Sequence, residues 1–501
     1  MDPIFSRPAR IFRGVLFGAL IVPMFAVAAE RTKLFVREAP ITVLGREATV
    51  MAIVQEEGGS GYSPEQKDGF HVEVVNELNV PTAIHWHGLI LPNLQDGVPW
   101  VTQDPIPPGA SMNYDFPLVQ SGTYWMHSHY GLQEQFLNAA PLIIWNDAER
   151  AKANRQFVVM LSDFSFTPPE KILEELKSPS PMPAMDTGKM DKPVRQIAQV
   201  WKDGRFTKSI VERPAADIDV HYDALLANRR TIDDPEVFEV EPGETVLLRI
   251  VAASSATDFL IDTGDLDAEL LAVDGKAVEP LRGDFFQLAV AQRIDLRVTI
   301  PPDGGAFPIL ARGEGTRQLA AVVLKTKGVR MEPLVSEAGL PAAALDNTQE
   351  KQLRAAAPLE KRPADRTLPA ALGGDMHNYV WTINGHAYPN RDSLDVKKGE
   401  RVEIEFTNST MMGHPMHLHG HDFQIVSIDG ERIDGALRDT VEVPPGSTIG
   451  IAFDADNPGV WAFHCHILYH LATGMFTVLK YDGAGTEFWQ PERMAQEDPS
   501  L

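Results

Sequence analysis

A pattern of strand-forming residues occurs three times along this chain. Each copy is led by glycine, alternates apolar and polar residues, and precedes a polar turn and a second strand: Asp68–Leu78, Pro242–Val251 and Lys398–Asn408. Alternation with a period of two is typical of a half-buried β-strand. Because the copies lie about 150 residues apart, they indicate whole domains and not solenoid units. The sequence therefore predicts an all-β protein of three similar β-sandwiches.

A second pattern links the first and third of these domains. Pro107-Pro-Gly leads to Gly122-Thr-Tyr-Trp-Met-His-Ser-His129, and Pro444-Pro-Gly leads to Gly459-Val-Trp-Ala-Phe-His-Cys-His466 at a matching distance. The middle domain carries a degenerate form at Ala291–Asp303, without the histidines. Metal-binding residue types are thus expected in the first and third domains alone.

The domain limits are predicted from breaks in the strand pattern. One break falls near Trp145–Arg155, and Met331–Gly374 is rich in Ala, Pro, Leu and charge without alternation, as in an interdomain linker. Helical spacing over Pro168–Lys177 predicts a short surface helix in the second domain. The expected segments are a signal peptide (1–29), domain one (30–150), domain two (151–330), a linker (331–374), domain three (375–483) and a C-terminal tail (484–501).

The first residues indicate export. Three separated arginines precede an apolar run from Val15 to Ala28, which ends in small residues, as in a secretory signal peptide. A membrane anchor is the alternative, and the run is short for it. We therefore expect a periplasmic or extracellular protein with no stable membrane insertion after cleavage. The formal net charge of −24 argues against nucleic acid as a partner.

The chain contains a single cysteine, Cys465. No internal disulfide can form, although exported proteins often contain them. The thiol is therefore predicted to serve chemistry or a metal.

Ten of the fifteen histidines lie in four clusters: His85-Trp-His87, His127-Ser-His129, His414-Pro-Met-His417-Leu-His419, and His464-Cys-His466 with His470. In a strand, residues i and i+2 face the same side, so each His-x-His presents two imidazoles to one surface. One such pair alone is weak evidence, but four in equivalent places of two repeats indicate a metal site. The other five are predicted to be surface or packing residues: His71, His221, His377, His386 and His421.

The alternation also predicts two metal sites on opposite sides of one strand. If His464 and His466 face one way, Cys465 between them faces the other way. Cys465 with His414, His470 and Met475 matches the His₂Cys plus axial Met set of a blue copper centre. Eight imidazoles remain, which suit three metal ions that bind and reduce O₂. Zinc, the competing metal, does not require ten histidines.

At these motifs the sequence resembles the three-domain multicopper oxidases, a family that includes laccases, ascorbate oxidase and bacterial copper-resistance oxidases. All four copper motifs are present in order, and the resemblance covers about Glu30 to Asp482. It implies cupredoxin-like Greek-key sandwiches, a copper-free second domain and four copper ions. The implied ligands are His414, Cys465, His470 and Met475 for type 1; His85 and His417 for type 2; His87, His127 and His466 for one type 3 ion; His129, His419 and His464 for the other.

The resemblance also suggests how protons reach O₂. Asp96, in Leu94-Gln-Asp-Gly-Val-Pro99, resembles the family's acid that hydrogen-bonds water near type 2 copper, and it is the proposed proton relay. The alternative is that Asp96-Gly97 forms an ordinary turn. In some spore-coat laccases an acid directly follows the last type 1 histidine; here Leu471 stands there. The catalytic set is then Cys465, His464, His466 and Asp96.

The predicted function is one-electron oxidation of a small reducing substrate, phenol-like or Cu(I), coupled to four-electron reduction of O₂ to water. Within the family, the sequences of the copper motifs most resemble those of the bacterial copper-resistance branch. Thioethers select Cu(I), and methionines occur at 182, 185 and 190 and, near the type 1 residues, at 411, 412 and 416. A non-catalytic periplasmic protein that binds or sequesters copper is the alternative, and a cupredoxin-like scaffold without copper is a third.

Overall fold

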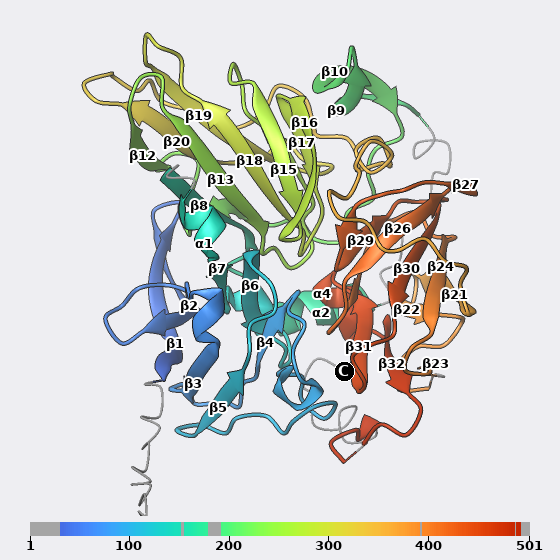
Figure 1. The fold of residues 1–501 in the computed structure, drawn as a ribbon. Helices are drawn as coiled ribbons and strands as arrows, with labels where there is room; N and C mark the ends of the chain where they lie inside the picture. Colours follow the sequence, from blue (N-terminus) through green and yellow to red (C-terminus); the bar gives the residue numbers. More distant parts are fainter. Residues whose placement is uncertain (1–30, 152–154, 179–191, 391–392, 486, 492–501) are drawn as a thin grey trace, which may run out of the picture.

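The computed structural model describes residues 31–151, 155–178, 192–390, 393–485 and 487–491. The predicted signal peptide and the methionines at 182, 185 and 190 lie outside the described residues. Figure 1 shows three β-rich bodies, with the first and third side by side below the second. The predicted all-β fold of three sandwiches is confirmed, because the strands form three pairs of sheets.

The first body pairs a sheet of order β2-β1-β3-β5 with one of order β4-β6-β7. In β3 every second side chain is buried, which is the alternation that the sequence predicts. The elements are β1 Thr32–Val43, β2 Arg46–Gln55, η1 Gln66–Asp68, β3 Phe70–Asn76, β4 Ile84–His87, η2 Asn93–Gln95, β5 Ser111–Phe116, β6 Gly122–Ser128, η3 Gln133–Phe136, β7 Ala139–Ile144 and α1 Asp147–Ala151.

The second body pairs an eight-stranded sheet, β11-β8-β13-β18-β15-β16-β10-β9, with a five-stranded one, β12-β20-β19-β14-β17. Its elements are β8 Arg155–Phe164, α2 Pro169–Lys177, β9 Val194–Lys202, β10 Arg205–Arg213, β11 Ala224–Ala227, β12 Glu236–Val240, β13 Thr245–Ala252, β14 Phe259–Asp262, β15 Ala268–Val273, β16 Lys276–Gly283, β17 Phe285–Leu288, β18 Arg293–Thr299, β19 Ala306–Gly313 and β20 Leu319–Thr326.

The third body pairs the sheet β22-β21-β24-β30-β26-β27, with β28 beside β26, and the sheet β23-β32-β31-β25-β29. Its elements are β21 Arg366–Asp375, β22 Val380–Ile383, β23 Leu394–Val396, β24 Arg401–Asn408, β25 His414–Leu418, β26 Phe423–Ile428, β27 Glu431–Arg432, β28 Leu437–Arg438, β29 Thr440–Val443, β30 Thr448–Asp454, β31 Val460–Cys465, α4 Leu468–Ala472 and β32 Phe476–Tyr481.

The three bodies repeat one strand arrangement. The Gly-led strands β3, β13 and β24 each pair in parallel with the first strand of their body, β1, β8 or β21. On the other side they pair antiparallel with β5, β18 and β30. The degenerate pattern in the middle body therefore occupies the same place in its sheet as the two Pro-Pro-Gly segments do in theirs.

The linker prediction was wrong at its C-terminal end. β21 begins at Arg366 and pairs with β24, so the third sandwich starts before residue 375. Only short stretches of β21 are buried, around Ala370 and Leu372, and the strand contains Pro369. Without a clear apolar alternation, this strand has the composition of a linker.

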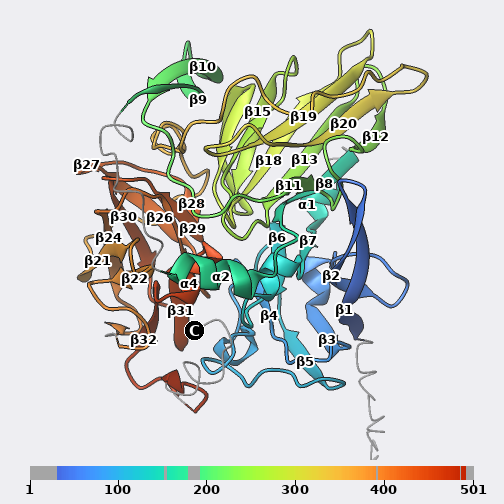
Figure 2. The same ribbon diagram turned by 180° about the vertical axis from the view of Figure 1, so that it is seen from behind.

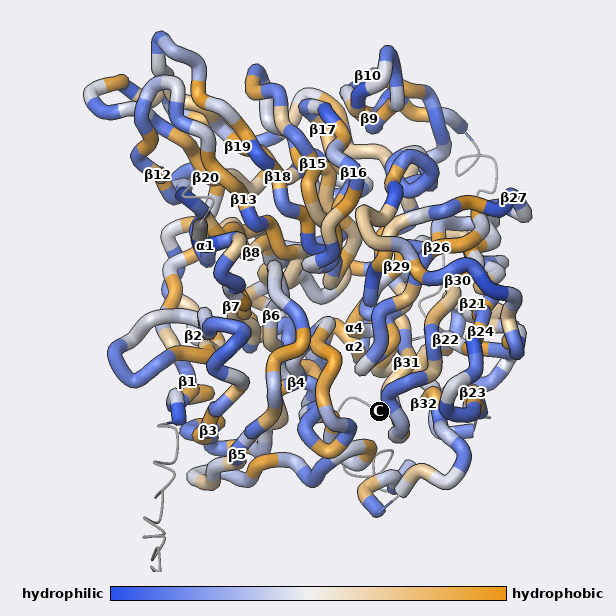
Figure 3. Tube along the Cα trace, viewed as in Figure 1, coloured by the Kyte–Doolittle hydropathy of each residue, from blue (hydrophilic) through white to orange (hydrophobic). Residues whose placement is uncertain are grey.

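The first and third bodies share one hydrophobic core. A continuous buried cluster runs from residues such as Val72 and Trp86 to residues such as Ile404 and Phe463, whereas the second body has its own cluster. Hydrophobic residues follow inner strands such as β13, and hydrophilic ones follow outer loops such as that beside β27 (Figure 3). The seam between the first and third bodies is thus a buried interface.

The helix predicted at Pro168–Lys177 is confirmed as α2, but its position differs from the prediction. Ile172 and Leu173 are buried in the core that the first and third bodies share. Figure 2 shows α2 beside α4, at the back of the seam. The helix therefore bridges the two other bodies, because its apolar side is covered by them.

Candidate metal centres

The four His-x-His segments lie on paired strands that meet at the seam. β4 pairs with β6 so that His85 is opposite His127, and β25 pairs with β31 so that His417 is opposite His464. The first and third sandwiches contribute four imidazoles each. The structure therefore brings together the eight histidines that the sequence places in one site.

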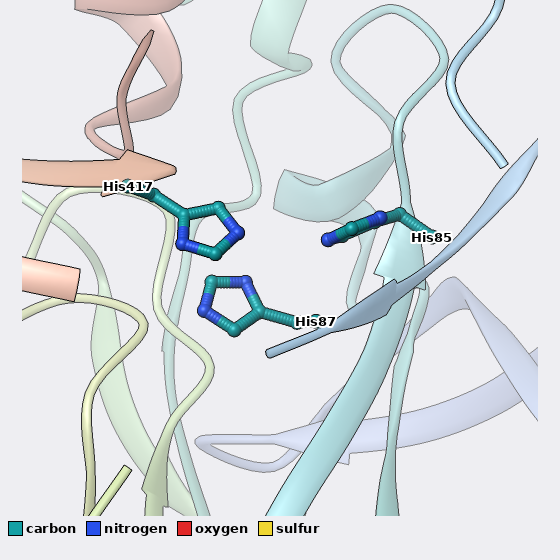
Figure 4. A group of neighbouring side chains, drawn as sticks. All are labelled: His85, His87 and His417. Carbon is teal, nitrogen blue, oxygen red and sulfur yellow. The ribbon is translucent and has the colours of Figure 1, made fainter. Parts of the chain in front are cut away.

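The eight imidazoles form compact groups. Within each group, one potential ligand atom per residue lies within 4.8 Å of the others: His85, His87 and His417; His87, His127 and His466; His129, His419 and His464. Figure 4 shows His417 reaching from the third sandwich towards His85 and His87 of the first. The His87 and His417 rings stack with centroids 3.8 Å apart.

Unpaired ring nitrogens show that these residues fit metal ions. Five of the eight histidines have a buried ring nitrogen with no hydrogen-bond partner among the described residues: His85, His87, His127, His417 and His466. The other ring nitrogen is engaged; for example, Nδ1 of His417 donates to the Asp439 carbonyl at 2.8 Å. Buried polar atoms are rarely left without partners in folded proteins. Metal ions would supply the missing partners, and the outer hydrogen bonds would fix the ring orientation.

Burial holds seven imidazoles of this site in the neutral form. Burial lowers the pKa of His464 to about 3, and neighbouring imidazoles add to the effect. Burial is also the main cause of the strongly lowered pKa of six further members: His87, His127, His129, His417, His419 and His466. Neutral imidazole is the form that binds metals. At neutral pH these seven histidines would bind metal without first losing a proton.

A second group lies on the other side of β31. The Cys465 sulfur is 3.8 Å from Nδ1 of His414 and 3.6 Å from Nδ1 of His470, and these two nitrogens are 3.2 Å apart. Burial raises the pKa of the Cys465 thiol well above its usual range, so metal binding here would release a proton. Met475 is fully buried, and its carbonyl accepts from the Cys465 amide at 3.1 Å.

Cys465 lies directly between the two groups. Its sulfur contacts His470 in the group of His414, Cys465 and His470. On the other side of the strand His464 reaches His419, with their Nε2 atoms 3.0 Å apart. The rings of His464 and His466 have centroids 5.5 Å apart on the far side. A thiolate ligand would thus be joined covalently, through a few backbone bonds, to two imidazoles of the larger group.

Asp96 is both a turn residue and a partner of the histidines. Its side chain is fully buried, and its Oδ2 accepts from Nδ1 of His419 at 2.9 Å. Oδ1 lies 3.2 Å from Nδ1 of His85, whose proton goes to the Asp96 carbonyl at 2.8 Å. The turn that follows Asp96 requires a glycine, because a Cβ on Gly97 would come within 1.9 Å of the Ile84 carbonyl oxygen.

Three acidic partners of the histidines were not predicted from the sequence. Glu134 on η3 lies 3.2 Å from Nδ1 of His127, Asp439 contacts His87 at 3.2 Å, and Asp219 accepts from Nε2 of His470 at 2.8 Å. Burial, and then the nearby Asp163, raises the pKa of Glu134 well above its usual range. Glu134 follows the second His-x-His closely and could have been noticed; Asp219, in a loop of the second body, gave no such signal.

The remaining histidines are surface or packing residues, as predicted. His421 is buried and pairs with the Tyr481 hydroxyl at 2.7 Å, which makes it a packing residue. His71 contacts Asp115 at a partly exposed position. The other three are exposed: His221, His377 and His386.

Comparison with known proteins agrees with this arrangement. Residues 36–149, 156–328 and 361–484 each match a multicopper oxidase family model. Multicopper oxidase MmcO of Mycobacterium tuberculosis is 33% identical over 418 residues, covering 83% of this chain and 79% of that protein. This chain belongs to the multicopper oxidase family. It is therefore a copper-dependent oxidoreductase that uses O₂ as acceptor, with four copper ions: one type 1, one type 2 and two type 3.

Further relatives extend the likeness across the chain. Copper resistance protein A of Escherichia coli is 28% identical, covering 90% of this chain and 92% of its own. The crystal structure of Fet3p, a multicopper oxidase, has a TM-score of 0.71 at 23% identity and covers 91% of this chain and 92% of its own. The crystal structure of a laccase from Botrytis aclada has a TM-score of 0.69 at 22% sequence identity, and the match covers 93% of this chain and 90% of the laccase chain. The predicted cupredoxin-like fold is confirmed by these structures.

Replacement of Cys465 with serine is expected to abolish the blue colour and the oxidase activity together, because a hydroxyl does not supply the soft thiolate. Metal analysis should find four coppers per chain in the wild-type protein and three in the variant. Retained turnover with an organic donor would contradict the role of the thiolate as the route for electrons. One or two ions in a fully active wild-type protein would contradict the ligand groups.

Proposed function

We propose that this multicopper oxidase oxidises a small metal cation, Cu(I) foremost. Each cation gives up one electron, and four such electrons reduce one O₂ to water. We assign type 1 copper to His414, Cys465 and His470, with Met475 as the axial ligand. The other eight histidines take the remaining ions: type 2 on His85 and His417; type 3 on His87, His127 and His466 and on His129, His419 and His464. When bound, these coppers accept electrons singly from the donor and deliver four of them to O₂.

A small acidic cavity beside the type 1 residues is the observation that supports a cationic donor. It is lined by the carboxylates of Asp217, Asp219, Asp258 and Glu314, the Met412 side chain and further residues, and its described lining contains no Lys or Arg. Carboxylate oxygens and a thioether attract metal cations, and the thioether favours Cu(I). The set comes mainly from the second body, with Met412 from the third.

Asp219 connects this cavity to the type 1 residues. Its side chain is 1% exposed; Oδ2 accepts from His470, whereas Oδ1 has no partner among the described residues. An unpaired carboxylate oxygen on a residue that lines a cavity is suited to a bound cation. An electron from a cation held there would pass through the Asp219–His470 hydrogen bond.

The dimensions of the cavity argue against an aromatic donor at this place. Its volume is about 40 Å³, which is room for a few water molecules, whereas a cavity that binds benzene is about 150 Å³. Both type 1 imidazoles are fully buried, and Nε2 of His414 is already paired with the Thr410 hydroxyl at 2.8 Å. A phenol would have no direct contact with either ring.

The three methionines near the type 1 residues differ in position. Met412 lines the cavity, Met411 is 68% exposed, and Met416 is fully buried in the core. Only Met412 is therefore part of the proposed cation site.

Export of the protein is part of the proposal, and it rests on the leader-like first residues. Among the described residues, no helix is long and apolar enough to cross a membrane. Fractionation of cells that express the full chain would test export, and an uncleaved product in the cytoplasm would contradict it.

Substitution of the cavity acids is expected to separate the two donor classes. In Asp217→Asn with Glu314→Gln, kcat/KM for Cu(I) should fall about tenfold, or roughly 1.4 kcal/mol of transition-state stabilisation, since two carboxyl groups that line the cation site are lost. Oxidation of a phenol should change less than twofold. Asp265→Asn, an exposed carboxylate elsewhere on the second body, is the matched control. Equal losses for both donors would favour a general laccase-like enzyme.

The pH should change the affinity for the cation. Burial raises the pKa of Asp258 to about 7, so its charged form appears only as the pH rises through that value. The KM for Cu(I) is therefore expected to fall as the pH rises through about 7, and Asp258→Asn should remove this step. A step that is unchanged in the variant would show that another group is responsible.

Asp96→Asn is expected to slow reoxidation of the reduced protein by O₂, while reduction of type 1 copper by the donor stays nearly unchanged. An amide does not exchange a proton, and protons are consumed at the O₂ step. Stopped-flow measurement of the two half-reactions separates them. Equal loss in both would indicate that Asp96 serves the fold alone.

A further inference from the structure

A buried ion pair joins the copper-free second body to the partners of the copper ligands. Arg293, at the start of β18, is fully buried, as is Asp439 in the third body. Nη1 of Arg293 donates to Oδ1 of Asp439 at 2.7 Å, and Nη2 donates to Oδ2. This two-point contact fixes the plane of the carboxylate.

Asp439 in turn contacts one histidine of the first body, His87, and one of its own body, His417. Its Oδ1 lies 3.2 Å from Nε2 of His87, and its carbonyl accepts from Nδ1 of His417 at 2.8 Å. The Thr440 hydroxyl donates to Oδ1 at 2.9 Å and lies 3.1 Å from both rings. Since a carboxylate only accepts, Nε2 of His87 carries the proton, and Nδ1 keeps its lone pair for a metal.

The first body leaves space for this ion pair at Gly88, directly after His87. A Cβ there would lie 2.3 Å from Oδ2 of Asp439 and 2.6 Å from Nη2 of Arg293. The Arg293 Nε also donates to the Thr123 carbonyl of the first body at 3.3 Å. All three bodies therefore meet at one guanidinium.

We propose that Arg293 is a positioning residue for the trinuclear copper site. By fixing and neutralising the Asp439 carboxylate, it sets the tautomer and orientation of His87 and the place of the Asp439 carbonyl that orients His417. The second body is then more than a spacer, because it determines the geometry of ligands that it does not supply. This inference rests on the proposed assignment of His87 and His417 as copper ligands, but not on the choice of donor.

Lysine cannot replace this arginine in the proposed role. A guanidinium makes two parallel hydrogen bonds to a carboxylate, whereas an ammonium is a single point charge that leaves the carboxylate free to rotate. Arg293→Lys thus keeps the charge and removes the orientation. Partners of metal-binding histidines typically change metal affinity or activity by 10- to 100-fold when they are altered.

The test compares Arg293→Lys with Arg249→Lys in copper-loaded full-length protein. Arg249 is the matched control: it is 1% exposed, binds Asp295 at 2.9 Å and reaches Thr123 of the first body at 2.7 Å, and none of its hydrogen-bond partners among the described residues binds a histidine. Metal analysis, the electron paramagnetic resonance signal of type 2 copper and the near-ultraviolet absorption of the type 3 pair report on the site. Thermal unfolding of the copper-depleted proteins reports on the fold separately.

In Arg293→Lys we expect the type 2 signal to shift or disappear and reoxidation by O₂ to slow at least tenfold. The blue colour and type 1 reduction should stay within twofold, and Arg249→Lys should resemble the wild type. Equal effects in both variants, or an unchanged type 2 signal in Arg293→Lys, would overturn the proposal. A wild-type protein without a type 2 signal would instead contradict the ligand assignment.

Thr440→Val keeps the test decisive if Arg293→Lys does not fold. Valine matches threonine in shape and lacks the hydroxyl that contacts Asp439, His87 and His417, so the ion pair stays intact. A shifted type 2 signal with unchanged unfolding of the copper-depleted protein supports the proposal that the contacts among Arg293, Asp439 and Thr440 position His87 and His417. An unchanged signal and unchanged reoxidation would overturn it.

Discussion

Five grouped imidazole nitrogens that have no hydrogen-bond partner among the described residues are the constraint on which the fold depends. A buried polar atom without a partner costs about 1–3 kcal/mol, so the five together cost on the order of 5–15 kcal/mol before metal binds. That range equals the net stability of a typical domain. The shared core of the first and third bodies must offset it, and copper bound to these nitrogens would remove it. The apolar seam and the metal site are therefore parts of one energetic arrangement.

Placing the site at a seam also explains why the chain needs repeated sandwiches. One strand pair presents four imidazoles to one face, and a second pair must face it to complete the set. A duplicated domain supplies this second pair in the same geometry. The alternation of β31 then gives the third body an additional site, since Cys465 faces away from the seam between His464 and His466.

Much of this organisation is local in sequence, and that part could be predicted. Strand alternation and His-x-His spacing depend on neighbouring residues, so the three sandwiches and the ten clustered histidines follow from them. The contacts that orient those histidines are not local. Arg293 and Asp439 are 146 positions apart, and Asp219 and His470 are 251 apart. Residues 366–375 and the seam position of α2 were misjudged for the same reason, because partners from elsewhere in the fold cover them.

The second body takes part in both sites although it offers no clustered histidine. Towards the type 1 residues it places Asp219, which lines the cavity; one of its oxygens accepts from His470, and the other has no partner among the described residues. Towards the larger site it places Arg293, whose guanidinium holds the Asp439 carboxylate against His87. Negative charge is suited to attracting a cationic donor, and positive charge is suited to fixing an acidic partner of the ligands. A domain without metal-ligand clusters of its own is thus under constraint at these two places, because Asp219 contacts a proposed ligand of the third body and Arg293 contacts the partner of one in the first.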